Sequence, residues 1–306
     1  MKDEKGAALI IVLGVVAMIA AWAATAAYED MVSLRRAENL QQASRAYMAS
    51  ESLLAVAQHF LREDAKDSVT DDLEETWAQA FPPLPLDEGL VAGEIVDENR
   101  YFNLNDLVNA QGQVDPLVLE IAKRLFFLLE VPTAQVDKLV DWMDADGRTN
   151  GPSGAEDSNY YDKPYRIKNA RLDRWQELGL IDGFDAAMQK VLRSVFTVRP
   201  VPATGKTLIN INTADQKLLM ALFPKMQEAD AMVFIGGRPY DGVAAAVSGQ
   251  LWATGVDVSR LSVASDAFSL RVHASFGRVN WREAYMLNRT SGKVLVAYRE
   301  PLGWEP

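Results

Sequence analysis

Two hydrophobic patterns follow one another in the first third of the chain. Residues 7–27 carry no charged side chain, and a helix of this length spans about 30 Å, enough to cross a bilayer. Beyond it, apolar residues recur at alternating steps of three and four from Leu40 to Leu61, with Ser50 in the one gap. This spacing marks one face of a helix. The two patterns together predict one helix over residues 7–64, half in lipid and half in water.

The closing segment shows the other hydrophobic period. From Phe268 to Phe276 apolar residues alternate with polar ones, and two further alternating runs follow the turn signals Gly277-Arg278 and Ser291-Gly292. Alternation with a period of two predicts strands with one buried face, here an antiparallel meander. Residues 90–101 predict one or two more short strands, after an extended, non-helical connector at residues 82–85 that is rich in proline.

The stretch between these β segments carries mostly helical signals. Helices are predicted from Asp115-Pro116 onward with Phe126 and Phe127 in the core, over residues 133–143 and 184–195, and after a capping box formed by Thr213 and Gln216. Asn103-Leu104-Asn105 and Asn210-Ile211-Asn212 each precede helical material, which hints at an internal duplication. The predicted fold class is α+β, with a long N-terminal helix, a small antiparallel sheet and a large, mostly helical insertion.

Composition narrows the function. The 306 residues hold 42 Asp+Glu against 31 Lys+Arg, and the net charge of −11 argues against a nucleic-acid binder, which needs a basic face. No cysteine is present, so disulfides and thiolate chemistry are excluded. The two histidines, His59 and His273, lie far apart in the sequence without a suggestive context. We therefore expect no enzyme and no catalytic residues.

The residues best suited to bind a ligand are concentrated in an acidic segment, residues 141–160. Its carboxylates and its glycines suit calcium, which takes six to eight oxygen ligands from carboxylates, carbonyls and water. The Asp144-Ala-Asp146-Gly147 start resembles an EF-hand loop, but Ala155 stands where the twelfth-position glutamate would be. Composition alone leaves two interpretations open: a calcium site, or a solvated acidic loop.

The first thirty residues allow three interpretations. The apolar run is longer than that of a secretory signal, although Ala24-Thr25-Ala26 is compatible with a signal-peptidase site. A plain uncleaved anchor is the second possibility. The third follows from the charged leader that ends in Gly6 before an apolar helix begins at Ala7.

A leader that ends in glycine, an apolar helix start and an amphipathic continuation resemble the amino terminus of type IV pilins and of the pseudopilins of type II secretion. The resemblance implies that prepilin peptidase cuts after Gly6 and methylates Ala7. Most members carry a glutamate at the fifth mature position, where it pairs with the amino terminus of the neighbouring subunit. Here that position is Ile11, a departure typical of K-type minor pseudopilins.

The order of the later segments extends this resemblance to nearly the whole chain: WAQAFPPLPL, YFNLNDL, DWMDADGRTNGPSGAEDSNYYDKPYR, LININTADQKLLMALFP and the final meander. The domain organisation it implies is a leader at 1–6, a helix at 7–64 with 7–27 transmembrane, a pilin-like β region at 65–104 and 266–306, and an inserted α-helical domain at 105–265.

The K-type resemblance also implies function. It implies a minor pseudopilin at the pseudopilus tip with I-type and J-type partners, anchored once in the bacterial inner membrane with its bulk in the periplasm, supporting the export of folded proteins. It implies bound calcium in the insertion, and the candidate ligands are Asp144, Asp146, Glu156 and Asp157, with Asp141 as a fifth.

The sequence also allows other functions. One alternative is a membrane-anchored periplasmic protein that binds calcium or another ligand through the acidic segment, and another is a tethered calcium-dependent hydrolase. The ATGKT segment at residues 203–207 lacks the first glycine of a phosphate-binding loop, because Pro200 stands there. LININTA resembles the opening of helix-hairpin-helix modules, and the acidic balance favours shared packing geometry over DNA binding.

Overall fold

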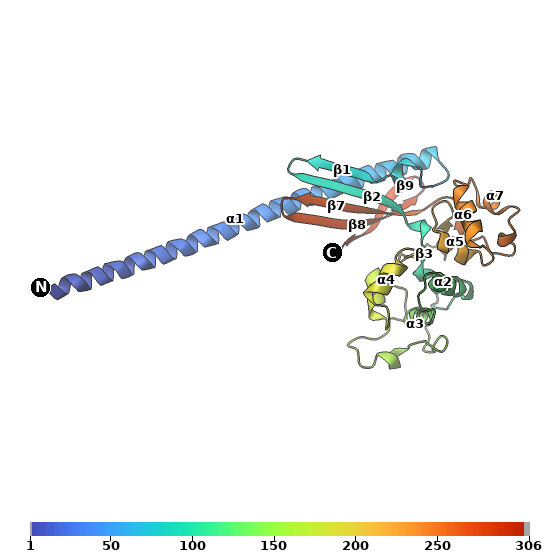
Figure 1. The fold of residues 1–306 in the computed structure, drawn as a ribbon, viewed down its shortest axis with the longest axis horizontal. Helices are drawn as coiled ribbons and strands as arrows, with labels where there is room; N and C mark the ends of the chain where they lie inside the picture. The colour runs from blue at the N-terminus through green and yellow to red at the C-terminus, as the bar shows by residue number, and fades with distance from the viewer. Residues whose placement is uncertain (1, 303–306) are drawn as a thin grey trace.

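A computed structural model describes residues 2–302, with the backbone alone for residues 2–5. Its first element is α1 (Lys2–Asp67), a 66-residue helix whose amino-terminal half projects far from the rest of the molecule (Figure 1). The predicted helix of 7–64 is therefore extended at both ends. No proline or glycine follows Gly14 until Pro82, so no local signal stops the helix earlier. Met1 and residues 303–306 lie outside the description.

Five antiparallel strands form the one large sheet, in the order β1-β2-β7-β8-β9. Their bounds are β1 (Phe81–Leu86), β2 (Gly89–Asp97), β7 (Ala267–Phe276), β8 (Val279–Thr290) and β9 (Lys293–Pro301). The predicted C-terminal meander is confirmed. Residues 82–85 are extended and non-helical, as predicted, but they belong to a strand and not to a connector. They lie within β1, an edge strand, which tolerates proline because only one side of it needs hydrogen-bond donors.

The second half of α1 packs along one face of this sheet (Figure 1). Only the later part of the predicted apolar stripe is buried there, Leu54, Ala57 and Leu61, whereas Leu40 is 70% and Tyr47 40% exposed. The buried face also contains Ala46, Ala49 and Leu53, which the predicted spacing did not include, and it packs against alternate residues of the strands, Phe268, Leu270, Val272, Tyr285 and Leu287. The gap in the stripe has a polar partner. The hydroxyl of Ser50 lies 2.8 Å from that of Tyr285, which donates to the buried Glu283 carboxylate at 2.7 Å. The pairing fixes how the helix is rotated on the sheet, because each of these groups is buried and needs its partner.

The chain between β2 and β7 leaves the sheet and folds into short helices and short parallel strand pairs beyond its end (Figure 1). One hydrophobic core runs through this region. The helices are α2 (Pro116–Leu128), α3 (Ala134–Met143), α4 (Ala186–Leu192), α5 (Gln216–Leu222), α6 (Glu228–Gly236) and α7 (Val243–Val247). The strands are β3 (Phe102–Asn103), β4 (Phe196–Thr197), β5 (Ile209–Asn210) and β6 (Leu261–Ser262). The 3₁₀ turns are η1 (Thr76–Ala78), η2 (Glu98–Arg100), η3 (Leu104–Leu107), η4 (Asp157–Tyr160), η5 (Trp175–Leu180) and η6 (Leu251–Ala253).

Three local predictions in this region need correction. The helix expected over residues 184–195 is shorter, and the capping box expected before α5 is not formed. Asp215 caps α5 by accepting a hydrogen bond from the Lys217 N–H at 2.8 Å. The Thr213 hydroxyl instead donates to the buried carboxylate of Asp97. Phe126 is buried, but its neighbour Phe127 is 74% exposed, because adjacent residues lie on different faces of a helix.

The hinted duplication has a clear structural counterpart. We call residues 102–197 the first repeat and residues 209–262 the second. Each begins with a strand that pairs in parallel with the strand at its own end, β3 with β4 and β5 with β6. Each strand ends in an asparagine whose side-chain oxygen accepts the N–H two residues on, Asn103 from Asn105 and Asn210 from Asn212. This local bond turns the chain toward its first helix.

The second asparagine of each repeat holds a distant segment in the same way. Asn105 accepts from the N–H of Leu172 at 2.7 Å and donates to its carbonyl at 2.8 Å. Asn212 accepts from the N–H of Tyr240 at 2.9 Å and donates to its carbonyl at 3.0 Å. We call each of these pairs an asparagine clamp. A side-chain amide has both a donor and an acceptor, so it substitutes for a strand partner at one residue.

The repeats differ in the connection between their second helix and the clamped residue. In the second repeat the connection is short, residues 237–239 between α6 and Tyr240. In the first repeat it comprises residues 144–171, between α3 and Leu172, and contains most of the acidic segment. We call residues 144–171 the acidic loop. The duplication thus shows that the long connection is an elaboration of a unit that also closes without it.

The carboxyl-terminal end of α1 is fastened to the sheet by a buried charge cluster. Arg289 of β8 donates to the Asp64 carboxylate at 2.7 Å, to the carboxylate of Asp71 and to the Ser265 carbonyl at 3.0 Å. Burial raises the pKa of Asp64 to about 6, and the nearby Glu75 and Asp71 charges add to this rise. The guanidinium is therefore the cation on which this group of acids depends.

We predict that Arg289→Gln lowers the free energy of unfolding by about 3–5 kcal/mol at pH 7, because it leaves buried carboxylates without their cation. The loss should be smaller at pH 5, where the cluster takes up protons. Thermal unfolding of the full chain in detergent micelles at both pH values measures this. Lys66→Gln, which removes an exposed ion pair with Glu63, is the matched control and should change little. Equal losses in the two variants would contradict the prediction.

Candidate metal centre

Helix α3 places the first two acids of the site. Asp137 and Asp141 lie one turn apart and are both buried, which puts their carboxylates on one face of the helix. Asp141 accepts from the Asn150 N–H at 2.7 Å, so the acidic loop folds back over the helix end. Gly154 lies so close to the Asp141 carboxylate that a Cβ at this position would collide with it. The glycine is therefore required by close packing, in addition to any flexibility it provides.

Three of the predicted ligands converge where α3 ends. Oxygen atoms of Asp144, Asp146 and Glu156 lie within 4.8 Å of one another, with Asp144 and Glu156 buried and Asp146 exposed. Asp144 Oδ1, Glu156 Oε1 and the second oxygen of Asp141, Oδ2, are buried without a hydrogen-bond partner. Buried carboxylate oxygens normally have a partner, so these three atoms are acceptors that a bound cation would satisfy.

The electrostatics of the cluster are unfavourable without a cation. Burial raises the pKa of Asp144 to about 7, with further contributions from Asp146, Asp141 and Glu156. The pKa values of Asp141 and Glu156 are also raised, again first by burial and then by their acidic neighbours. Among the described side chains, residues 6–302, no lysine or arginine forms an ion pair with any of these four acids. Their mutual repulsion is therefore not compensated by the protein.

Another predicted ligand, Asp157, points elsewhere. Its carboxylate forms an ion pair with Arg166 at 3.2 Å and accepts from the Ile167 N–H at 3.2 Å. It thus ties together two parts of the acidic loop and lies outside the group of converging oxygens. The sequence could not show this, because Asp157 directly follows Glu156 and only the backbone path decides which way each side chain points.

One acid beside the site was missed by the sequence analysis. The Asp137 carboxylate lies 3.1 Å from the Lys123 ammonium of α2. Its position one turn before Asp141 was a usable signal. Because Asp137 already has a cation, the uncompensated group is Asp141, Asp144, Asp146 and Glu156.

These residues fit a hard divalent cation. The donors are all oxygens, several are buried and unpaired, and glycines bring the loop backbone close to them. Calcium accepts such a mixed and irregular oxygen set, whereas zinc favours nitrogen and sulfur. No residue of the cluster is a nucleophile next to a base, so its geometry supports binding rather than chemistry.

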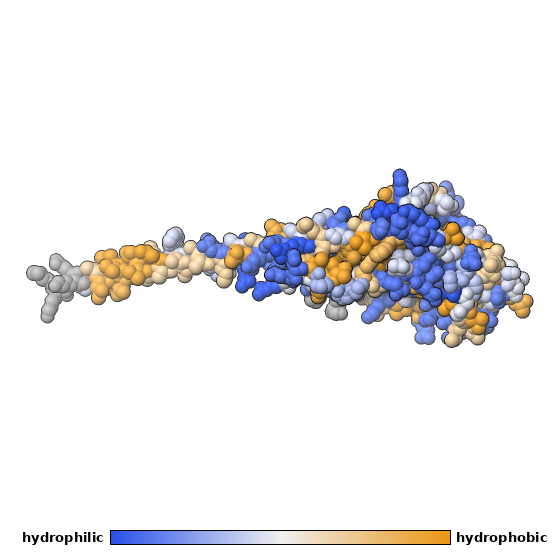
Figure 2. Space-filling model, turned by 90° about the horizontal axis from the view of Figure 1, so that it is seen from above, coloured by the Kyte–Doolittle hydropathy of each residue, from blue (hydrophilic) through white to orange (hydrophobic). Residues whose placement is uncertain are grey.

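The predicted processing and assembly residues lie on the projecting half of α1. Apolar side chains dominate this part of the surface (Figure 2), and it meets the length and composition of a membrane-spanning helix without any burial against the protein. Gly6 has open space around its Cα, and the side chain of Ile11 is 66% exposed. The segment therefore offers its apolar surface to lipid or to neighbouring helices. Ala7 lies in the same exposed stretch.

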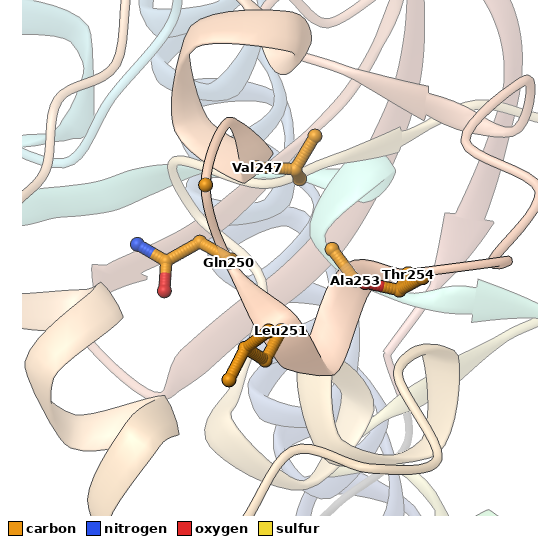
Figure 3. Close-up of a pocket in the computed structure, with 6 residues that line it drawn as sticks. Val247, Gln250, Leu251, Ala253 and Thr254 are labelled. Atoms are coloured by element: carbon orange, nitrogen blue, oxygen red, sulfur yellow. The ribbon is translucent and has the colours of Figure 1, made fainter.

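Other surface features carry little chemistry. A hollow of about 310 Å³ beside α7 is lined by Val247, Gln250, Leu251, Ala253 and Thr254, none of which is ionisable, and Leu251 stands out into solvent (Figure 3). His59 and His273 are both exposed, on α1 and β7. Neither the hollow nor the histidines form a catalytic arrangement.

Comparison with known proteins supports one family. The profile described as "Type II secretion system (T2SS), protein K" matches residues 209–271, and the profile of the first domain of the same protein matches residues 100–201. These two ranges contain the second and the first repeat. The family thus has a sequence profile for each half of the duplication.

Individual relatives agree. Type II secretion system protein K of Pseudomonas aeruginosa is 32% identical over 72% of this chain and 69% of its own length. The protein of the same name from Klebsiella pneumoniae is 30% identical over 96% of both chains, and that of Pectobacterium carotovorum is 28% identical over 98% of this chain and 97% of its own.

A solved structure shares the fold. A chain of the crystal structure of the GspK-GspI-GspJ complex from enterotoxigenic Escherichia coli matches with a TM-score of 0.77 at 24% identity, over 88% of this chain and 100% of that chain. The predicted α+β architecture and the family resemblance are both confirmed. From the matched profiles and the relatives that cover most of its length, we conclude that this chain belongs to the protein K family of the type II secretion system, the K-type minor pseudopilins.

Proposed function

We propose that this minor pseudopilin occupies the tip of the pseudopilus, where it packs with I-type and J-type minor pseudopilins and supports the export of folded proteins across the outer membrane. Its role is structural, without enzymatic activity. The GspK-GspI-GspJ complex, a structural neighbour of this chain, supports the choice of partners.

The observation that carries the tip position is that residues 7–27 of α1 contain no charged side chain. A carboxylate within lipid is costly and needs a partner, which in pilin-like subunits is the amino terminus of the adjacent subunit. Ile11 stands at the position where most family members carry that carboxylate, and residues 7–27 contain no Asp or Glu. A subunit of this kind has no charge to pair with a subunit ahead of it, so it suits the first place in an assembly.

The shape of the molecule supports the same position. Both repeats project beyond the end of the sheet, at the opposite end of the molecule from the free half of α1 (Figure 1). Subunits that add from the membrane side meet the helix and the sheet first. The repeats would cover the distal end and leave no equivalent surface for a further subunit.

Membrane insertion precedes assembly in this proposal. Residues 7–27 cross the bacterial inner membrane once, the leader at residues 1–6 stays on the cytoplasmic side, and the sheet and both repeats lie in the periplasm. Prepilin peptidase then removes the leader after Gly6 and methylates Ala7. The alternative, a membrane-anchored periplasmic protein that binds calcium or another ligand, needs no such cut.

We predict that the mature chain begins at methylated Ala7 in cells with prepilin peptidase and at Met1 in cells without it. Intact-mass and amino-terminal analysis of the purified chain measures this. Gly6→Leu, which alters only the cleavage position, should leave the leader attached in both strains. A leader that stays attached in the wild type, or a cut near Ala26, would favour the alternative function.

The tip position makes a second prediction. Immunogold labelling of an epitope-tagged chain should mark filament ends in the wild type. Ile11→Glu restores the usual carboxylate and should allow some subunits along the filament shaft, because each can then pair with the subunit ahead. Ile11→Gln, which is polar but uncharged, is the matched control and should remain at the ends. Labelling along the shaft in the wild type would contradict the tip position.

We further propose that the acidic loop binds calcium as a structural cation. Asp144, Asp146 and Glu156 would supply the first ligands because their oxygens converge. Asp141 would supply a further one, because its buried Oδ2, like Asp144 Oδ1 and Glu156 Oε1, has no hydrogen-bond partner. Asp157 would contribute indirectly, by closing the loop through Arg166 and Ile167. The cation would remove the repulsion among four acids that have no other counter-charge.

Calcium removal should therefore destabilise the protein. Calcium at a hundred times its dissociation constant stabilises a protein by about 2.7 kcal/mol, so we expect chelator to lower the melting temperature of the full chain by roughly 5 °C. Glu156→Gln should remove most of this difference, because Glu156 faces the cation. Differential scanning calorimetry in micelles, in excess calcium and in chelator, measures both effects.

Asp157→Asn is the matched control, one residue along the chain. It should lower the melting temperature in both conditions and keep most of the difference between them, because Asp157 closes the loop without lying among the converging oxygens. The same melting temperature for the wild type in calcium and in chelator would contradict the calcium proposal.

A further inference from the structure

The acidic loop is attached to η5, the 3₁₀ turn that follows it. The Tyr165 hydroxyl donates to the Leu180 carbonyl at 2.9 Å, and the Asp182 N–H donates to the Tyr160 hydroxyl at 3.3 Å. The Lys168 ammonium donates to the Glu177 carboxylate at 2.8 Å. These bonds position η5 through residues that belong to the acidic loop itself.

The same turn is in contact with the sheet. The side-chain amide of Gln176 in η5 donates to the Glu300 carboxylate of β9, on the sheet face away from α1. Within the described part of the chain, this is the one side-chain hydrogen bond between residues 104–194 and the five-stranded sheet. A cavity of about 100 Å³ lies beside it, between Trp175 and Arg193 on one side and Ser269 on the other. Polar and apolar residues of both the first repeat and the sheet line this cavity, so the two are incompletely packed against each other here.

The remainder of the first repeat is held independently of η5. Its closing strand, β4, is fixed where the Thr197 hydroxyl donates to the Glu98 carboxylate at 2.7 Å. Helix α2 is fixed to the second repeat, because Arg124 donates to the Ala221 carbonyl at 3.2 Å. The segment from η5 to α4 has anchors of its own as well, because Asn105 holds Leu172 and Lys138 of α3 forms an ion pair with Asp182 at 2.6 Å. The acidic loop adds to these anchors, and it is the part of the attachment that a cation would affect.

The second repeat provides an internal comparison. It closes its own clamp at Tyr240 with a connection of residues 237–239 and no cluster of acids. It is joined to the end of the sheet through Asn210 and Thr213, both of which donate to Asp97. Nothing in these attachments requires a cation.

We propose that calcium in the acidic loop controls the docking of η5 on the outer face of the sheet, while the second repeat keeps its position with or without the ion. This rests on the calcium proposal above. Without the cation, Asp141, Asp144, Asp146 and Glu156 repel one another and the loop opens. The packing of Tyr160 and Tyr165 against Trp142 is then lost, and η5 loses the bonds that hold it beside Glu300.

The chain has no native cysteine, so distances between introduced labels test this directly. Spin labels at Lys190→Cys on α4, next to η5, and at Asn280→Cys on β8 report the docked segment. Labels at Lys217→Cys on α5 and at Asn280→Cys report the second repeat. All three positions are exposed. Pulsed electron–electron double resonance on the full chain in lipid nanodiscs measures each distance distribution, once in calcium and once in chelator.

We expect the 190–280 distribution to be narrow in calcium and to broaden in chelator, while the 217–280 distribution stays the same. Gln176→Ala should broaden the 190–280 distribution even in calcium, and should leave the calcium-dependent rise in melting temperature intact. This variant separates docking from binding, because Gln176 contacts the sheet and lies outside the acidic loop.

Three results would overturn the inference in distinguishable ways. A melting temperature that depends on calcium together with an unchanged 190–280 distribution would end the docking inference and leave the calcium site standing. Equal broadening of both distributions would mean that the ion stabilises the whole insertion. A melting temperature that does not respond to calcium would remove the site and the inference together.

Discussion

The packing of one helix against one sheet sets the geometry of the whole molecule. Helix α1 is a single element in two environments, without charge on any side over residues 7–27 and apolar on one face between Ala46 and Leu61. The buried contact of Ser50 with Tyr285 fixes its rotation, and Arg289 fixes its end. Both repeats are connected to this sheet, so the side-chain contacts of α1 also determine how the repeats are oriented relative to the membrane-spanning part.

The insertion shows how a site is added to a duplicated scaffold. Each repeat needs only a strand pair, two helices and an asparagine clamp, and the amides of Asn105 and Asn212 close their repeats in the same manner. The clamp tolerates connections of very different length, because it holds one residue at the end of the connection and places no demand on the residues before it. The acidic loop occupies this permissive position, so its carboxylates are gathered without changing the framework.

The sequence predicted the parts of the structure that depend on local periodicity. The single long helix, the C-terminal meander and the positions of α2 and α3 follow from spacing and capping signals, and three of the candidate ligands do converge. It could not predict what long-range contacts decide. β1 was missed because proline is a strand breaker except at an edge, and whether a segment lies at an edge is a property of the whole sheet. The direction of Asp157 could not be predicted, because it depends on the backbone path of the acidic loop, which brings Arg166 beside this carboxylate.

The two edge strands of the sheet determine how easily it can pair with the sheet of another molecule. Pro82, Pro83 and Pro85 remove three hydrogen-bond donors from β1, and on the opposite edge Gln58 of α1 donates to the Val294 carbonyl of β9 at 3.2 Å. Open strand edges are where sheets of separate molecules join and aggregate. The prolines of β1 therefore limit the ability of this edge to pair with the sheet of another molecule, and a side chain of α1 occupies one carbonyl of the other edge strand.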